Sequence, residues 1–207
     1  MENGFYAIVY RMRYINRWAL MRGTNEENLA EHSLDVAMIA HALCLIGNKR
    51  YGRHLDADLA AVIGLYHDAA EIITGDMPTP VKYGSRRMHD AYEEIEGEAV
   101  EQLLSLLPGD LKDDYRQIFE GDNAEDGRYL RRLVKAADKI SAYIKCEEEE
   151  NSGNSEFRTA KESTRKSLDA MVKELPEVRD FVRDCLPAYG RTLDELRQPG
   201  TEETSLS

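Results

Sequence analysis

Residues 34–45 are apolar at almost every helical position, and this stretch constrains the fold more than any other part of the chain. A helix that is apolar on all sides is stable only when neighbouring elements cover it. Two capping-box pairs could start such a helix, Thr24 with Glu27 or Asn28 with Glu31. We therefore expect a buried central helix. Its apolar residues are Leu34, Val36, Ala37, Met38, Ile39, Ala40, Ala42, Leu43 and Leu45.

Helical spacing of apolar residues recurs along the rest of the chain. Asp56 is a good N-cap for a third helix, which Gly75 ends, and residues 147–154 are typical of a solvated helix end and turn. We find no strand alternation, internal repeat or linker, so we predict one all-α domain over residues 1–198 and a disordered tail over 199–207. The further predicted helices are 5–15, 56–73, 86–107, 111–119, 130–145, 156–175 and 178–185.

Charge and composition exclude several classes of function. The chain has 39 acidic and 27 basic residues, a net charge of −12, which disfavours a nucleic acid polymer as partner but not a small phosphorylated molecule. No apolar run approaches the roughly 18 residues of a membrane span, and the N-terminus lacks the features of a secretory signal. The lack of such a run leads us to expect no membrane association. The three cysteines form no CxxC pair, so we expect a reducing compartment, the cytoplasm.

Polar residues interrupt three of the apolar helices. His67 and Asp68 are adjacent within the third helix, His32 opens the second, and Asp138 lies beside an apolar stripe of a later one. A carboxylate inside a core helix is costly unless it is paired or bound to a metal. Two imidazoles and two carboxylates suit Mn, Fe, Co, Ni or Zn. Taken singly, each has a plainer explanation: a hydrogen-bonded core histidine, a cap residue, or a partner for a neighbouring lysine.

The order His32…His67-Asp68…Asp138 resembles the HD-domain metal-dependent phosphohydrolases. More closely, four segments together resemble the bacterial 5'-deoxynucleotidases of that superfamily, and the resemblance is dense from Phe5 to Phe157. Ala70 stands where we expect a serine, and residues 84–88 and the C-terminal region differ more freely. The four segments are INRWALMR, EHSLDVAMIAHAL, YHDAAEIITGDMPTPVKY and KAADKISAYIKCEEE.

The resemblance implies an all-α HD-domain helical bundle that holds one divalent metal, such as Co or Mn, through His32, His67, Asp68 and Asp138. Asp68 would take part in catalysis, and Glu71 would act as general base on the attacking water. Without the resemblance, Glu71 could equally be a surface or helix-capping carboxylate.

Substrate contacts are implied as well. Arg17 would bind the phosphate and Trp18 would orient it, although a lone tryptophan is also a common core anchor. Lys82 could add positive charge or simply be solvated. A loop of four residues would meet the sugar, or form only a rigid turn. That loop is Asp76, Met77, Pro78 and Thr79, and His32, Asp68 and Asp138 would also line the substrate site.

One metal is the simpler expectation, because two-metal members of the superfamily need extra histidines after the HD pair. Only His89 lies between Asp68 and Asp138, and His41 shares a stripe with Leu34 and Leu45 that suits core packing. The implied reaction is hydrolysis of 2'-deoxynucleoside 5'-monophosphates by a homodimer. Two alternatives stay open: hydrolysis of a nucleoside triphosphate or phosphodiester, and a non-catalytic all-α scaffold.

Overall fold

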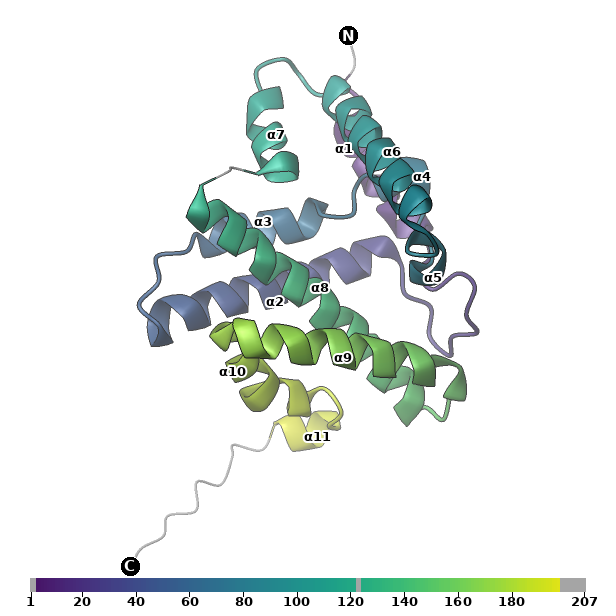
Figure 1. Cartoon of the computed structure of the whole chain (residues 1–207), viewed down its shortest axis with the longest axis vertical. Coiled ribbons are helices and arrows are strands. Elements are labelled where there is room, and N and C mark those ends of the chain that lie inside the picture. The colour runs from purple at the N-terminus through teal and green to yellow at the C-terminus, as the bar shows by residue number, and fades with distance from the viewer. Residues whose placement is uncertain (1–2, 122–123, 198–207) are drawn as a thin grey trace, which may run out of the picture.

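The structure, a computed structural model, describes residues 3–121 and 124–197 (Figure 1). Within these ranges the chain forms helices and turns, and the only β-type pairing is an isolated bridge between Asn16 and Asn28. The prediction of an all-α chain is confirmed. The predicted tail, residues 199–207, lies outside the described ranges.

Eleven α-helices and three short 3-10 helices make up the described chain. Their bounds are α1 Phe5–Val9, η1 Tyr10–Tyr14, α2 Leu29–Arg50, α3 Ala57–Tyr66, α4 Glu71–Thr74, α5 Thr79–Lys82, α6 Arg86–Ser105, α7 Lys112–Glu120, α8 Glu125–Asn151, η2 Ser155–Phe157, α9 Arg158–Glu174, α10 Pro176–Asp184, η3 Leu186–Ala188 and α11 Leu193–Leu196.

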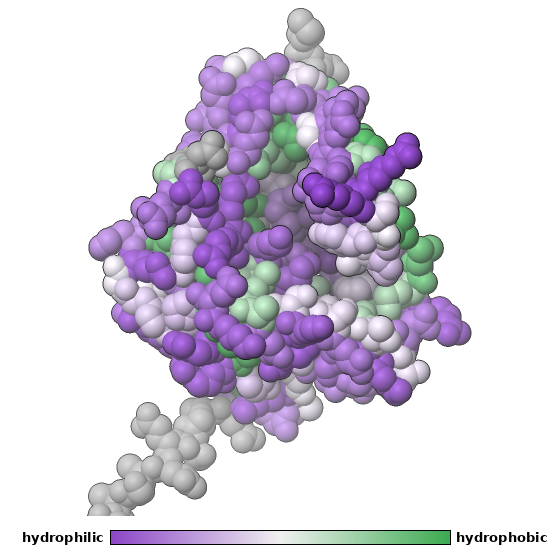
Figure 2. All heavy atoms as spheres, in the orientation of Figure 1, coloured by the Kyte–Doolittle hydropathy of each residue, from purple (hydrophilic) through white to green (hydrophobic). Residues whose placement is uncertain are grey.

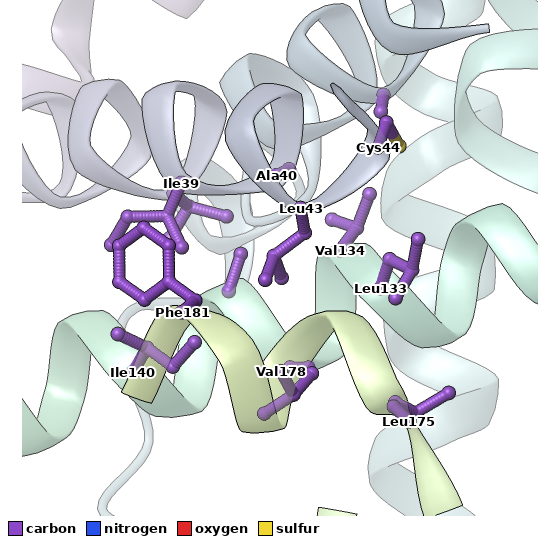
Figure 3. Packing of buried hydrophobic residues seen from close by; sticks show 14 of the residues in the cluster. Ile39, Ala40, Leu43, Cys44, Leu133, Val134, Ile140, Leu175, Val178 and Phe181 are labelled. Atoms are coloured by element: carbon purple, nitrogen blue, oxygen red, sulfur yellow. The ribbon is translucent and has the colours of Figure 1, made fainter. Parts of the chain in front are cut away.

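Helix α2 is the central element, as its sequence predicts. Of the two predicted capping pairs, the structure uses Asn28 and Glu31 in a complete capping box. α2 packs against α3, α8 and α10 and crosses the middle of the molecule (Figure 1). Side chains of α2, α8 and α10, among them Leu43, Val134 and Val178, meet in the larger apolar core (Figure 3).

The length and hydropathy of α2 alone would allow it to cross a membrane, contrary to our expectation from the apolar runs. Half of its most apolar window is buried within the protein. A core helix and a membrane span have the same composition, and here the packing against three other helices accounts for the apolar residues.

One stripe of α2 is exposed, which corrects the prediction that His41 packs in the core. Leu34 and Leu45 are 53% and 41% exposed, and the side chain of His41 is 40% exposed. His41 lies near Asp58 on α3, with Nε2 3.8 Å from Oδ1. α2 carries apolar side chains on every face, so their spacing in the sequence does not reveal which face the other helices leave uncovered.

The predicted helix 56–73 is interrupted at its most polar point. Asp56 caps its start as predicted, by accepting a hydrogen bond from the Leu59 amide. α3 then ends at Tyr66, and the next residues form tight turns in which the Ala69 amide donates to Tyr66 and the Glu71 amide to Asp68. α4 follows and ends at Gly75, where φ is +75°. Residues 67–70 are thus a turn between two helices.

A second, smaller apolar core forms around the N-terminal segment. Phe5 and Met12 are buried there with Leu103 and Leu104 of α6. The predicted first helix is present but tightens into the 3-10 helix η1 from Tyr10 onward. α6 begins at the predicted residue, packs against α4 and α7, and flanks the segment that leads to the 76–79 loop.

Candidate metal centre and active site

Segments of α2, the α3–α4 turn and α8 bring the four predicted ligands together. Asp68 Oδ2 lies 3.0 Å from His67 Nε2 and 3.6 Å from His32 Nε2. Asp138 Oδ1 lies 3.3 Å from His32 Nε2 on the other side. One ligand atom each of His32, His67 and Asp68 lie within 4.8 Å of one another. Three of the predicted ligands thus share one point, and Asp138 adjoins it through His32 Nε2.

Both histidines turn the same nitrogen toward this point. The Gly64 carbonyl lies 2.8 Å from His67 Nδ1, and a carbonyl can only accept, so Nδ1 carries a proton. His32 Nδ1 lies 3.0 Å from Ser141 Oγ on α8. The Nε2 atoms of both rings are buried and have no hydrogen-bond partner among the described residues. Partners on Nδ1 with Nε2 left open are what metal-binding histidines require, so the residues fit a divalent cation.

The charges of the cluster are strongly interdependent. Burial lowers the pKa of His67, but the carboxylates of Asp68 and Asp138 outweigh it and raise the pKa to about 9. Burial raises the pKa of Asp68, yet neighbouring His67 holds it below its ordinary value. The pKa of Asp138 is lowered further, against the effect of burial, by His32 and by Lys139. Two ionised carboxylates beside the imidazoles give the cluster the charge that attracts a cation.

Asp138 divides its two oxygens between two partners. Oδ1 faces His32, while Oδ2 lies 3.0 Å from Lys139 Nζ. The plainer explanation for Asp138, pairing with a neighbouring lysine, therefore accounts for one oxygen only. The other remains directed at the histidine cluster.

Glu71, the predicted base, begins α4 one turn after the HD pair. Its Oε2 is buried without a hydrogen-bond partner in the described part of the chain. Burial raises the pKa of Glu71 to about 9, and the carboxylates of Asp68 and Asp76 act in the same direction. Arg17 and Lys82 oppose this shift. A cation held by the neighbouring ligands would oppose it as well and favour the ionised form.

Arg17 is held next to the cluster. Its Nη1 lies 3.3 Å from Asp68 Oδ2, and its Nε lies 3.1 Å from Glu27 Oε2. The side chain is only 11% exposed. Burial lowers the pKa of Arg17, but Asp68 and Glu27 outweigh it and raise it above its ordinary value. A permanently charged guanidinium thus stands beside the cluster of predicted ligands, where it could bind a phosphate group.

Trp18 and the 76–79 loop are joined directly. The Trp18 amide donates to Asp76 Oδ2 at 3.2 Å, and the pKa of Asp76 is raised because burial outweighs the effect of Arg17. Met77 and Pro78 are half-buried and Thr79 is exposed at the start of α5. Lys82 pairs with Glu96 of α6 at 2.9 Å, so it is not simply solvated.

The face of the molecule in Figure 2 is hollowed near its middle, and the recess is lined mainly with hydrophilic surface. It lies in the region where α2, α3 and α8 approach one another in Figure 1. His89 does not join the central cluster. It belongs to a separate, largely exposed group on α6 with Asp90 and Glu93.

Four residues that support the site are not apparent from the sequence patterns. Glu27 binds Arg17, Ser141 contacts His32, and Gly64 allows α2 and α3 to approach closely. Glu149 lies in the segment predicted to be solvated, yet it is fully buried. Ser141 follows Asp138 by three residues on one helix face, and that spacing was a usable signal. The other three contacts join segments that the sequence does not place together.

Comparison with known proteins assigns the chain to a family. The model of the family described as 5'-deoxynucleotidase YfbR-like matches residues 4–189. The chain belongs to the YfbR-like family. Two relatives of this YfbR-like chain are named 5'-deoxynucleotidases. The protein from Shewanella oneidensis is 44% identical over 195 residues, which cover 93% of this chain and 97% of the relative. The one from Vibrio vulnificus is 43% identical over 197 residues, covering 94% and 98%.

Solved structures confirm the HD-domain fold of this YfbR-like protein. An HD-domain phosphohydrolase from Listeria innocua superposes with a TM-score of 0.76 at 22% identity, covering 89% of this chain and 87% of the other. An HD phosphohydrolase of cyanophage S-2L, solved with dA and one catalytic Zn²⁺ ion, superposes with a TM-score of 0.64 at 20% identity, covering 89% and 95%. At these identities the likeness concerns the fold alone.

Proposed function

We propose that this protein hydrolyses 2'-deoxynucleoside 5'-monophosphates to deoxynucleoside and phosphate. The observation that carries the proposal is the position of Arg17, whose guanidinium reaches Asp68 at the edge of the two-histidine, two-carboxylate cluster. A phosphate group placed there would meet both a fixed cation and a metal. The names of relatives at 40–44% identity agree with this reaction.

His32, His67, Asp68 and Asp138 would hold one divalent metal, which supplies Lewis-acid polarisation of a phosphoryl oxygen. The open Nε2 atoms of both histidines support this ligand set. The donors are nitrogen and oxygen, so Co, Mn and similar transition metals suit the site. The single catalytic zinc ion in the cyanophage phosphohydrolase agrees with one divalent metal, though not with a particular element.

The protein's own groups then divide the remaining work. Arg17 binds the phosphate oxygens and neutralises charge that develops on them. Glu71, whose buried Oε2 has no hydrogen-bond partner among the described residues, would accept the proton of the attacking water at that oxygen. Asp68 contacts both histidines and Arg17, so it fixes the position of the Arg17 guanidinium relative to the metal ligands.

The sugar would meet the loop formed by Asp76, Met77, Pro78 and Thr79. Asp76 Oδ2 already accepts from the Trp18 amide, and its carboxylate can accept from a 3'-hydroxyl as well. Trp18 would help to orient the phosphate, and the pocket wall near its indole or near the loop would restrict space beside the ribose. A 2'-hydroxyl would then be rejected by lost space or lost solvation.

Phosphate release from a substrate panel tests this function. With Co²⁺ or Mn²⁺ added, we expect release from dAMP and dTMP and little from AMP. Faster turnover of nucleoside triphosphates or cyclic nucleotides would favour the alternative HD hydrolase. No turnover of any deoxynucleotide with these metals would reject the proposal.

We also propose that the protein is a cytoplasmic homodimer. Its buried cysteines Cys44 and Cys146 are free thiols, which suits a reducing compartment. The exposed apolar stripe of α2, with Leu34, Met38 and Leu45, supports a contact with a second copy. Sedimentation of the wild type and a Met38→Glu variant tests the dimer, because a charge in the contact should yield monomers.

A further inference from the structure

A single carboxylate oxygen links the two substrate-binding residues of the N-terminal segment. Glu27 Oε2 accepts from Arg17 Nε at 3.1 Å and from Trp18 Nε1 at 2.9 Å. The Glu27 carbonyl also accepts from the Arg17 amide at 2.9 Å. The Glu27 side chain is only 11% exposed, so little water competes for these bonds. Hydrogen bonds to a charged, poorly solvated acceptor are the strong kind.

Trp18 adopts a backbone conformation that needs such support. It is the only residue other than glycine with positive φ in the described ranges, at 59°. Left-handed backbone at a bulky residue costs of order 1 kcal/mol and persists only where surrounding contacts enforce it. Three contacts do so here: Glu27 on the indole nitrogen, Asp76 on the amide, and the buried ring of Phe157 at 5.3 Å between centroids.

Arg17 depends on Glu27 in a different way. The guanidinium of Arg17 contacts Glu27 through Nε and Asp68 through Nη1. Neither of these two contacts uses Nη2. Asp68 is one of the proposed metal ligands and lies beside Asp138, so both carboxylates attract the guanidinium. Glu27 holds Arg17 through Nε, a different nitrogen from the Nη1 that faces Asp68. Without it, the guanidinium would settle against the ligand carboxylates and be less available to phosphate.

We propose that Glu27 is a positioning residue that fixes the Arg17 guanidinium and the Trp18 indole as one unit for phosphate and deoxyribose binding. The inference rests on the proposed deoxynucleotidase function and adds to it a residue that touches neither substrate nor metal. Glu27 acts only through its two neighbours. Its loss should therefore weaken substrate binding more than it slows the chemical step.

The experiment compares Glu27→Ala and Glu27→Gln with a matched control. Glu177→Gln is the control, because Glu177 also accepts from an arginine Nε, that of Arg53 at 2.6 Å, and from an aromatic side chain, Tyr129, at 2.8 Å. Glu177 packs against Gly47, which lies about 22 Å along α2 from His32. The control thus breaks a similar pair far from the proposed site.

Trp18 is the only tryptophan, so fluorescence excited at wavelengths beyond tyrosine absorption reports on it alone. We expect Glu27→Ala to shift the emission and to increase acrylamide quenching in the metal-free protein. KM for dTMP with Mn²⁺ should rise about tenfold to hundredfold, with a smaller change in kcat. Glu27→Gln keeps the acceptor oxygen and should restore KM to within about tenfold of the wild type. Glu177→Gln should lower the melting temperature and leave KM and fluorescence unchanged.

Two failures are distinguishable. If the wild type is active and Glu27→Ala keeps wild-type KM and quenching, the positioning role is wrong while the function stands. If Glu177→Gln raises KM as much as Glu27→Ala, the effect of Glu27 is general destabilisation, which also overturns the proposal. A wild type that turns over no deoxynucleotide rejects the function, whatever the fluorescence of the variants shows.

Discussion

At the scale of single residues, the chemistry depends on polar groups placed where burial makes them expensive. His32 is fully buried, its Nε2 has no hydrogen-bond partner within the described ranges, and Asp138 Oδ1 faces it at 3.3 Å. A cation between them would satisfy both groups. The adjacent Lys139 neutralises only the other oxygen of Asp138. Replacement of Asp138 should therefore affect metal binding and enzyme activity more than it affects the stability of the fold.

Replacement of Asp138 by Ala tests this. We expect activity at least about a hundredfold lower and no rise in melting temperature on addition of Mn²⁺, because a ligand is gone. The wild type should melt at a higher temperature with Mn²⁺ than after chelation. Calorimetry with and without metal gives both values. An active variant, or one whose melting still responds to Mn²⁺ as the wild type does, would contradict the ligand role.

The sequence singled out, as candidate ligands, residues whose types are anomalous in their surroundings. His32, Asp68 and Asp138 stand out because each interrupts a helical pattern of apolar residues in the sequence. Glu27 carries no such signal, since a glutamate in a polar loop is ordinary. Its importance arises only when the loop folds back and brings Arg17 and Trp18 against it.

At the scale of elements, the close approach of α2 and α3 brings His32 and His67 near each other. Gly64 permits it: a Cβ there would lie 2.7 Å from the Ala37 Cα and 2.9 Å from its amide nitrogen. These are backbone atoms of α2, which cannot rotate away. The Gly64 carbonyl also orients His67. Gly64 therefore sets the spacing of the two helices and the ring direction of one ligand.

Gly64→Ala should destabilise the protein by about 1–3 kcal/mol and weaken metal binding, since α2 and α3 must separate. Helix propensity acts in the opposite direction, favouring Ala by about 1 kcal/mol. Gly97 on α6 is the control, because nothing lies within 4 Å of a Cβ there. Gly97→Ala should be stabilising. Urea unfolding measures both, and a neutral or stabilising Gly64→Ala would refute the argument.

Glu149 anchors the segment before α2 to the end of α8. Its carboxylate accepts from the Thr24 amide at 2.8 Å, from the Asn25 amide at 3.2 Å and from Lys145 Nζ at 2.6 Å. Burial raises the pKa of Glu149, but the bonds from Lys145, Thr24 and Asn154 outweigh it and hold the pKa far below the ordinary 4.5. The ionised carboxylate therefore stabilises the folded chain.

The stability that Glu149 contributes depends on pH. The folded-state pKa is depressed, so this stabilisation is present above the unfolded pKa near 4.5 and is lost as the pH falls through the folded-state value. Glu149→Gln should lower the melting temperature at pH 7 by roughly 5–10 °C. The difference in melting temperature between this variant and the wild type should narrow as the pH drops below about 4.5. Thermal unfolding across that range measures it, and a gap that widens on acidification would contradict the anchoring role.

Element boundaries were predictable where a cap or a glycine marks them. Asp56 and Gly75 bound the predicted third helix correctly, but its break at residues 67–70 has no sequence marker. Apolar spacing continues through the turn, and no proline or glycine lies there. The burial of Glu149 was missed because four consecutive glutamates are typical of a solvated face.

At the scale of the whole molecule, a net charge of −12 coexists with a site for an anionic substrate. Arg17 supplies positive charge at the site itself. It is buried next to the predicted ligands, so solvent ions screen its charge less than they screen surface charges. The all-α fold and its central helix followed from hydrophobic spacing. The arrangement of helices around α2 did not, and the exposed stripe through Leu34 and Leu45 shows that burial is decided by tertiary contacts.

The central claim is that two imidazoles and two carboxylates from separate segments of the chain bind one cation. Anomalous diffraction from crystals grown with Co²⁺ tests it most directly. We predict one strong peak per chain, about 2.0–2.2 Å from His32 Nε2, His67 Nε2 and oxygens of Asp68 and Asp138. Two tightly held ions, or a peak away from these four side chains, would contradict it.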